Sequence, residues 1–133
     1  MSRIDAARVR VPKAAGHGAG TWIKERVEAI ALIPLSLWAF WAAAHLAGAG
    51  YQAMVEWLRQ PLNAVLLALF VLISVDHMRL GLRVVVEDYI HRPGNKAALL
   101  LLNLFVCGLI GALALFAILK VALSGPANTL FGA

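Results

Sequence analysis

Three long apolar runs, separated by short polar segments, dominate the pattern of the chain. They cover residues 27–47, 62–89 and 97–120. Each is long enough to form a membrane-spanning helix, because about 20 residues rising ~1.5 Å each cross the ~30 Å hydrocarbon core of a bilayer. We therefore predict an all-α membrane protein with three transmembrane helices.

The segments outside these runs are short and polar or glycine-rich. Residues 1–20 are predicted to form a basic, flexible tail and residues 124–133 a short external tail. The three-helix membrane unit between them occupies residues 21–123. Two loops are predicted within it, at residues 48–61 and 90–96, the second because it contains a Pro-Gly-Asn sequence that breaks helices.

The composition excludes a soluble domain. Hydrophobic residues make up 62% of the 133 residues and charged residues only 14%, and the mean hydropathy is +0.80. A soluble chain of this length has too little interior to enclose that much apolar surface. The net charge of +5 comes from basic residues that flank the spans. Because they are not interleaved with stacking aromatic residues, we expect no nucleic-acid binding.

The distribution of Lys and Arg predicts the orientation in the membrane. Basic residues are concentrated in the N-terminal tail and in the second loop, whereas the first loop and the C-terminal end carry one each. Cytoplasmic segments are enriched in Lys and Arg. The N-terminus and the second loop are therefore predicted to be cytoplasmic, with the C-terminus on the periplasmic side.

The second span carries ionisable residues where a membrane should exclude them. Asp76, His77, Arg79 and Arg83 all lie before its apolar run has ended. Each such residue costs about 2.5–3.5 kcal/mol at the centre of a spanning helix unless a partner compensates it. Asp76 and Arg79 are three residues apart and can pair directly. Arg83 lies on the same side, so we predict an ion-pair stripe there, with a single unpaired imidazole on another side of the helix.

That imidazole, His77, has three possible roles. It could form a hydrogen bond to a neighbouring helix, or it could be one step in a proton relay, although relays need several titratable groups in sequence. It could also be an axial ligand of haem iron. Gly81 lies one turn further on the same face and would leave room for a flat macrocycle. No second histidine of this chain faces inwards, so another chain would supply a second haem ligand.

Asp88 and Tyr89 end the second span. They lie about 16–18 Å beyond His77 along a helix, which is the predicted cytoplasmic interface. A tyrosine at this level is commonly part of the interfacial aromatic belt. A tyrosine hydroxyl beside a carboxylate is also suited to bind the carbonyl of a quinone.

The third span has no charge from Ala97 to Leu119, and a lone cysteine, Cys107, lies in its middle. It cannot form an internal disulfide, and we interpret it as a small packing residue. Gly108 and Gly111 nearby are predicted to allow close helix packing.

These residues carry a resemblance to a known family. The pattern His77-x3-Gly81-x6-Asp88-Tyr89, on the second of three spans, resembles the smaller hydrophobic membrane-anchor subunit of succinate dehydrogenase in its alphaproteobacterial and mitochondrial form. The resemblance covers roughly residues 20–123. It implies one half of a two-subunit, six-helix anchor.

The resemblance also implies roles for individual residues. His77 matches the axial ligand of haem b, whose other ligand comes from the larger cytochrome b anchor subunit. Tyr89 matches the residue that binds ubiquinone, with Asp88 beside it. Arg26 matches, less specifically, an arginine near the haem propionates. The larger anchor's Ser-Pro-His and His-Arg-x-Thr-Gly segments are absent from this sequence.

The implied function is electron transfer with no catalytic residue on this chain. Succinate would be oxidised on a flavoprotein subunit, and electrons would pass through an iron–sulfur subunit to ubiquinone. The chain would anchor this head in a bacterial inner membrane, or in the mitochondrial inner membrane if it is eukaryotic. Two alternatives remain at this point, the anchor of a fumarate reductase and a non-enzymatic membrane scaffold.

Overall fold

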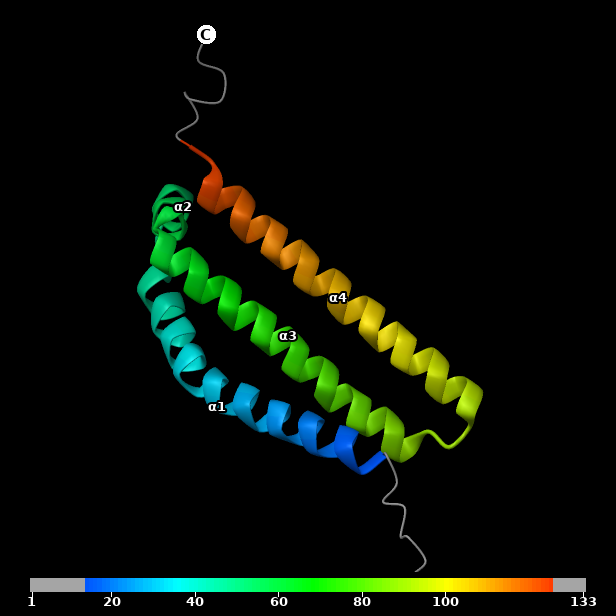
Figure 1. Ribbon diagram of the computed structural model, residues 1–133. Helices are drawn as coiled ribbons and strands as arrows, with labels where there is room; N and C mark the ends of the chain where they lie inside the picture. Colours follow the sequence, from blue (N-terminus) through cyan, green and yellow to red (C-terminus); the bar gives the residue numbers. More distant parts are fainter. Residues whose placement is uncertain (1–13, 126–133) are drawn as a thin grey trace, which may run out of the picture.

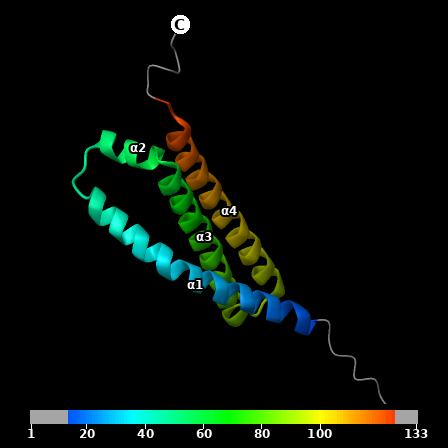
Figure 2. The same cartoon turned by 60° about the vertical axis from the view of Figure 1, so that its left-hand side comes forward.

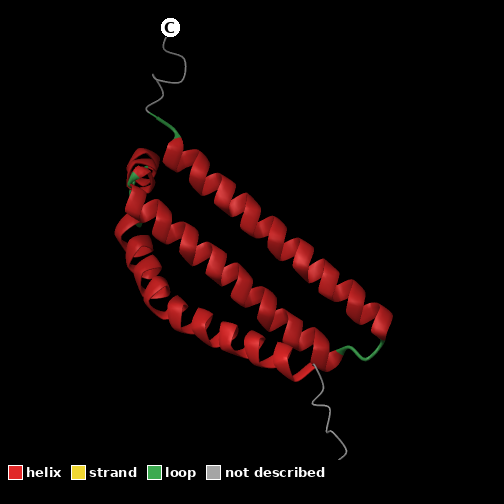
Figure 3. Cartoon of the chain, viewed as in Figure 1, coloured by secondary structure: helices red, strands yellow, loops and turns green. Residues whose placement is uncertain are grey.

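The computed structural model describes residues 14–125 and is helical throughout its regular structure (Figure 3). Its helices are α1 (Ala14–Leu46), α2 (Tyr51–Arg59), α3 (Pro61–Tyr89) and α4 (Pro93–Leu123). No strand occurs within the described range. Three of the helices, α1, α3 and α4, are long and apolar enough to cross a membrane. The predicted fold class, an all-α chain with three membrane-length helices, is confirmed.

The helix boundaries differ from the prediction mainly at the starts. Helix α1 begins at Ala14, inside the predicted tail of residues 1–20, and the rest of that tail lies outside the described residues. Helix α4 begins at Pro93, so the second loop is shorter than predicted. A proline favours the first turn, where its missing N–H breaks no hydrogen bond. Most of the predicted external tail, residues 126–133, also lies outside the described part.

The first loop, predicted over residues 48–61, contains the short helix α2. Helix α1 ends just before Gly48, whose φ of 82° is a left-handed conformation that glycine adopts without steric penalty. Helix α2 then packs against α3 and α4, and its Trp57 ring stacks on Trp38 of α1 with 5.8 Å between centroids. The connection is therefore a structured cap over one end of the long helices.

Helix α3 lies between α1 and α4 (Figure 1). Figure 2 shows that α1 runs close to α3 in its N-terminal half and diverges from it towards α2. Helix α1 is bent, and Pro34 lies inside it. A proline inside a helix removes one backbone hydrogen bond and clashes with the preceding turn, which bends the axis. Contacts between α1 and α3 are therefore concentrated in the half that carries Lys24 and Glu28.

The surfaces of the long helices are almost entirely apolar and exposed. Among the described residues, the enclosed hydrophobic side chains are Ala42, Leu80, Cys107 and Ile118. Most of the large apolar side chains of the long helices are exposed instead. This is expected where lipid or other subunits surround the helices. Figure 1 places the start of α1 and the connection from α3 to α4 at the same end. The described start of the first helix and the second basic loop therefore lie at the same end of the molecule.

Candidate functional site

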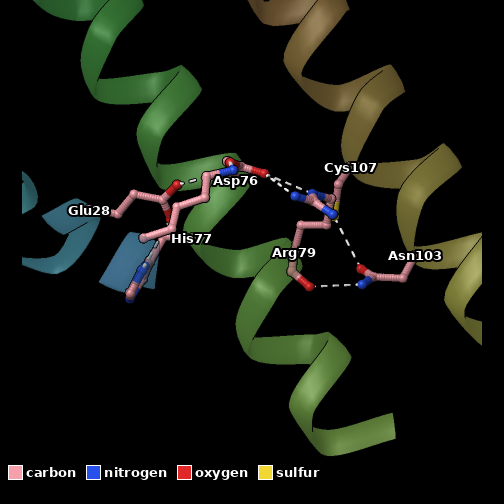
Figure 4. A network of polar contacts seen from close by, with 7 residues as sticks. Glu28, Asp76, His77, Arg79, Asn103 and Cys107 are labelled. Carbon is pink, nitrogen blue, oxygen red and sulfur yellow. Dashed lines mark hydrogen bonds and ion pairs between the residues drawn. The ribbon is translucent and has the colours of Figure 1, made fainter. Parts of the chain in front are cut away.

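His77 lies in the middle of α3, with its side chain between α3 and α1 (Figure 4). Its Nδ1 is buried and lies 3.7 Å from Oε2 of Glu28. Neither atom has a hydrogen-bond partner in the described part of the chain. The side chain as a whole is 40% exposed. Because Nδ1 is enclosed, the exposed surface belongs to other atoms of the side chain, and Nε2 is the ring nitrogen that remains for a ligand bond.

Glu28 is an acidic neighbour of His77 that the pattern of the second span does not reveal. It is only 9% exposed, although it lies in the first membrane span. Lys24, one turn earlier on α1, lies 3.6 Å from its Oε1 and also bonds to Asp76 of α3. The imidazole is therefore less isolated than predicted: α1 brings a carboxylate to 3.7 Å from Nδ1, although the two atoms form no hydrogen bond.

The predicted ion pair between Asp76 and Arg79 is present. Nε and Nη2 of Arg79 lie 2.7 Å and 2.6 Å from Oδ1 of Asp76. Arg83 is not part of this pair: its Nε donates to Oε1 of Glu87 at 2.7 Å, one turn further along α3. The predicted stripe thus consists of two separate pairs, and Lys24 joins the first of them to α1.

Asn103 connects this region to α4 (Figure 4). Its Nδ2 donates to the backbone carbonyl of Arg79 at 2.9 Å, and its Oδ1 accepts from Sγ of Cys107 at 3.3 Å. Cys107 is buried, as predicted. The third span is therefore apolar but not featureless: its single amide fixes α4 against the turn of α3 that carries the ionisable residues.

The other predicted site residues lie apart from His77. Tyr89 is 76% exposed at the end of α3, next to exposed Asp88, and neither side chain has a polar partner within residues 14–125. Arg26 lies over the ring of Trp22, 5.3 Å from its centroid. It has no hydrogen bond or ion pair to His77 among the described residues. Their predicted roles stay predictions.

The surroundings of His77 have room for a haem. Gly81, one turn further along α3, is exposed, and a Cβ added there would meet nothing within 4 Å. A flat macrocycle could therefore lie beside the ring. The described residues contain no group of three or more His, Cys, Asp or Glu side chains that could hold a metal ion.

These features define a multi-pass membrane protein whose second long helix carries one histidine beside a network of ion pairs. The family profile described as the succinate dehydrogenase/fumarate reductase transmembrane subunit matches residues 7–124, and the chain belongs to that family. The resemblance inferred from the His77 to Tyr89 pattern is confirmed.

Individual relatives agree with the family. The chain is 32% identical to the succinate dehydrogenase hydrophobic membrane anchor subunit of Rickettsia conorii, over 79% of this chain and 84% of the relative. It is 30% identical to the protein of the same name from Rickettsia bellii, over 66% of this chain and 70% of the relative. No solved structure matches the chain.

Proposed function

We propose that the chain is the smaller membrane anchor of a succinate dehydrogenase, and that it shares a haem b and contributes to a ubiquinone site. The relatives named as succinate dehydrogenase hydrophobic membrane anchor subunits support the anchor role and favour succinate dehydrogenase over fumarate reductase. The observation that carries the haem assignment is the imidazole of His77. Its Nδ1 is buried, its side chain is 40% exposed, and Gly81 leaves an open surface one turn further along the helix.

In this proposal Nε2 of His77 would hold the haem iron from this chain, and a residue of the larger cytochrome b anchor subunit would hold it from the other. When bound, haem b provides a one-electron redox centre within the membrane. The contribution of this chain is to hold the ring in place. His77 lies near the middle of α3, where Asp76 binds both Arg79 of the same helix and Lys24 of α1. Such anchoring limits rotation of the helix that carries the ligand.

Tyr89 and Asp88 are proposed to contribute to the ubiquinone site. Both are exposed at the end of α3, about 18 Å along the helix from His77. A phenol hydroxyl there can donate a hydrogen bond to a quinone carbonyl, and the neighbouring carboxylate can accept a hydrogen bond or hold a proton. Their lack of polar partners within residues 14–125 leaves both groups available for a ligand or a second subunit.

The proposed partners are a flavoprotein, an iron–sulfur protein and the larger anchor, all assembled with this chain and membrane lipid. The extensive exposed apolar surface of α1, α3 and α4 suits contact with the second anchor and with lipid. The clustering of basic residues supports a cytoplasmic N-terminus and a bacterial inner-membrane location.

The test is a reduced-minus-oxidised spectrum of the purified complex carrying His77→Ala. We expect the b-type haem signal to be lost or converted while the four subunits still copurify. His45→Ala is the matched control. His45 lies in the last turn of α1, far along that helix from Glu28, and its ring stacks on Trp41. A normal haem spectrum in an assembled His77→Ala complex would discard the ligand assignment.

A further inference from the structure

Two buried polar atoms face each other between α1 and α3 without completing a hydrogen bond. They are Oε2 of Glu28 and Nδ1 of His77, at 3.7 Å. An unsatisfied polar atom in a dry interior costs about 1–3 kcal/mol. Neither atom has a hydrogen-bond partner elsewhere among the described residues, so a small approach of the two side chains would satisfy both.

The position of Glu28 is fixed independently of His77. Its Oε1 lies 3.6 Å from the ammonium of Lys24, which also bonds to Asp76. Lys24 therefore holds one carboxylate oxygen and leaves the second directed at the imidazole, as Figure 4 shows for Glu28 and His77. Glu25, three residues earlier on the same helix, is also acidic but has no ion pair in the described part of the chain.

We propose that Glu28 is a positioning residue for His77: its carboxylate accepts a hydrogen bond from Nδ1–H and thereby presents Nε2 to haem iron. The inference rests on the proposed function, in which His77 is an axial ligand. Metal-binding histidines generally donate their second ring N–H to a carboxylate or carbonyl, which fixes the tautomer and raises the basicity of the ligand.

A carboxylate partner has an electronic consequence that packing alone does not have. By withdrawing the Nδ1 proton towards itself, the carboxylate makes the imidazole a stronger donor, and a stronger donor stabilises the ferric state of the iron. Removing the negative charge should therefore shift the haem equilibrium towards the reduced form. We expect the ratio of reduced to oxidised haem at a given potential to rise on the order of tenfold. This corresponds to an increase of about 59 mV in the midpoint potential of a one-electron couple.

The experiment is a redox titration of the haem in the purified four-subunit complex carrying Glu28→Gln, together with the low-spin ferric electron paramagnetic resonance spectrum. The substitution preserves shape and removes the charge. We expect a higher midpoint potential and altered g values, or loss of haem from an otherwise assembled complex. Glu25→Gln removes the same charge from the same helix, and should leave both quantities at the wild-type values.

A second variant covers the case in which Glu28→Gln fails to assemble. Glu28→Asp keeps the charge but retracts it by one methylene from an atom already 3.7 Å away. A smaller shift in the same direction supports the proposal. Wild-type potential and g values in every assembled Glu28 variant overturn it. A wild-type complex without haem, or a His77→Ala complex that keeps it, would instead refute the proposed function.

Discussion

The ion pair between Asp76 and Arg79 should be energetically coupled, and the coupling can be measured. Removing one partner of a fully buried pair costs about 3–5 kcal/mol, whereas exposed pairs contribute ~0–1 kcal/mol. The side chains of Arg79 and Asp76 are 26% and 31% exposed, and Asp76 keeps Lys24 as a second partner. We therefore expect Arg79→Ala to destabilise the anchor by about 2 kcal/mol, between these limits.

A double-mutant cycle separates this coupling from lost packing. Asp76→Ala alone should also destabilise, because it leaves both Arg79 and Lys24 without that carboxylate. The double variant should be more stable than the sum of the single effects predicts, by at least ~1 kcal/mol. The control is Arg83→Ala, whose pair with Glu87 is more exposed, at 47% and 40%, and should cost less than ~1 kcal/mol.

The assay is titration of the purified complex with sodium dodecyl sulfate in mixed micelles, following the fraction of this chain that stays assembled. Apparent free energies are compared among the wild type, the two single variants and the double variant. Additivity within about 0.5 kcal/mol would show that the two side chains act independently. In that case the pair would be a consequence of helix geometry with no stabilising role.

Three further predictions concern single positions. Tyr89→Phe should lower quinone reduction about tenfold through loss of one hydrogen bond, while succinate oxidation with a soluble acceptor is retained; equal loss of both activities would indicate failed assembly. Gly111→Leu should destabilise the complex by roughly 1–3 kcal/mol, because a Cβ added there would lie 3.6 Å from Val75. Gly108→Leu is the control, because a Cβ added at Gly108 meets nothing within 4 Å. Similar stability of the two variants would contradict the packing of Gly111 against α3. Gly81→Leu should reduce haem content without preventing assembly, and full haem content would exclude a macrocycle beside it.

Much of the fold follows from hydrophobicity alone, because a membrane requires long apolar helices. The end predicted for the second span, Tyr89, is the residue at which α3 ends. Helix α2 cannot be predicted in the same way. It is nine residues long, lacks a side-chain N-cap hydrogen bond and is stabilised by contacts such as the stacking of Trp57 on Trp38. Tertiary contacts of this kind leave no periodic signal in the sequence.

Glycine positions show the same limit. Gly108 and Gly111 are both predicted to allow close packing, but only Gly111 is enclosed and faces Val75 of α3. Three residues rotate the helix by about 300°, which leaves the two positions only about 60° apart, so a helix wheel alone does not separate them. Small residues in the third span are visible in the sequence, but which of them faces a neighbour depends on how the helices pack.

The partner of His77 cannot be found from the second span alone. A wheel drawn for that span separates His77 from the acidic and basic residues beside it, and so makes it look isolated. The signal is on the first span, where Glu28 is a single carboxylate in a long apolar run, four residues after Lys24. A buried charge requires a partner, and here that requirement points from α1 towards α3.

The charges around His77 cancel without its participation. Lys24 and Arg79 contribute two formal positive charges, and Glu28 and Asp76 contribute two negative ones, all joined by contacts within 4 Å. The network can therefore lie inside a membrane as a neutral unit, which lowers the penalty for burying each member. It follows that His77 need not carry a proton charge to satisfy its neighbours. A neutral imidazole is the form that binds a metal, so the charge balance of these four residues is compatible with the ligand role proposed for His77.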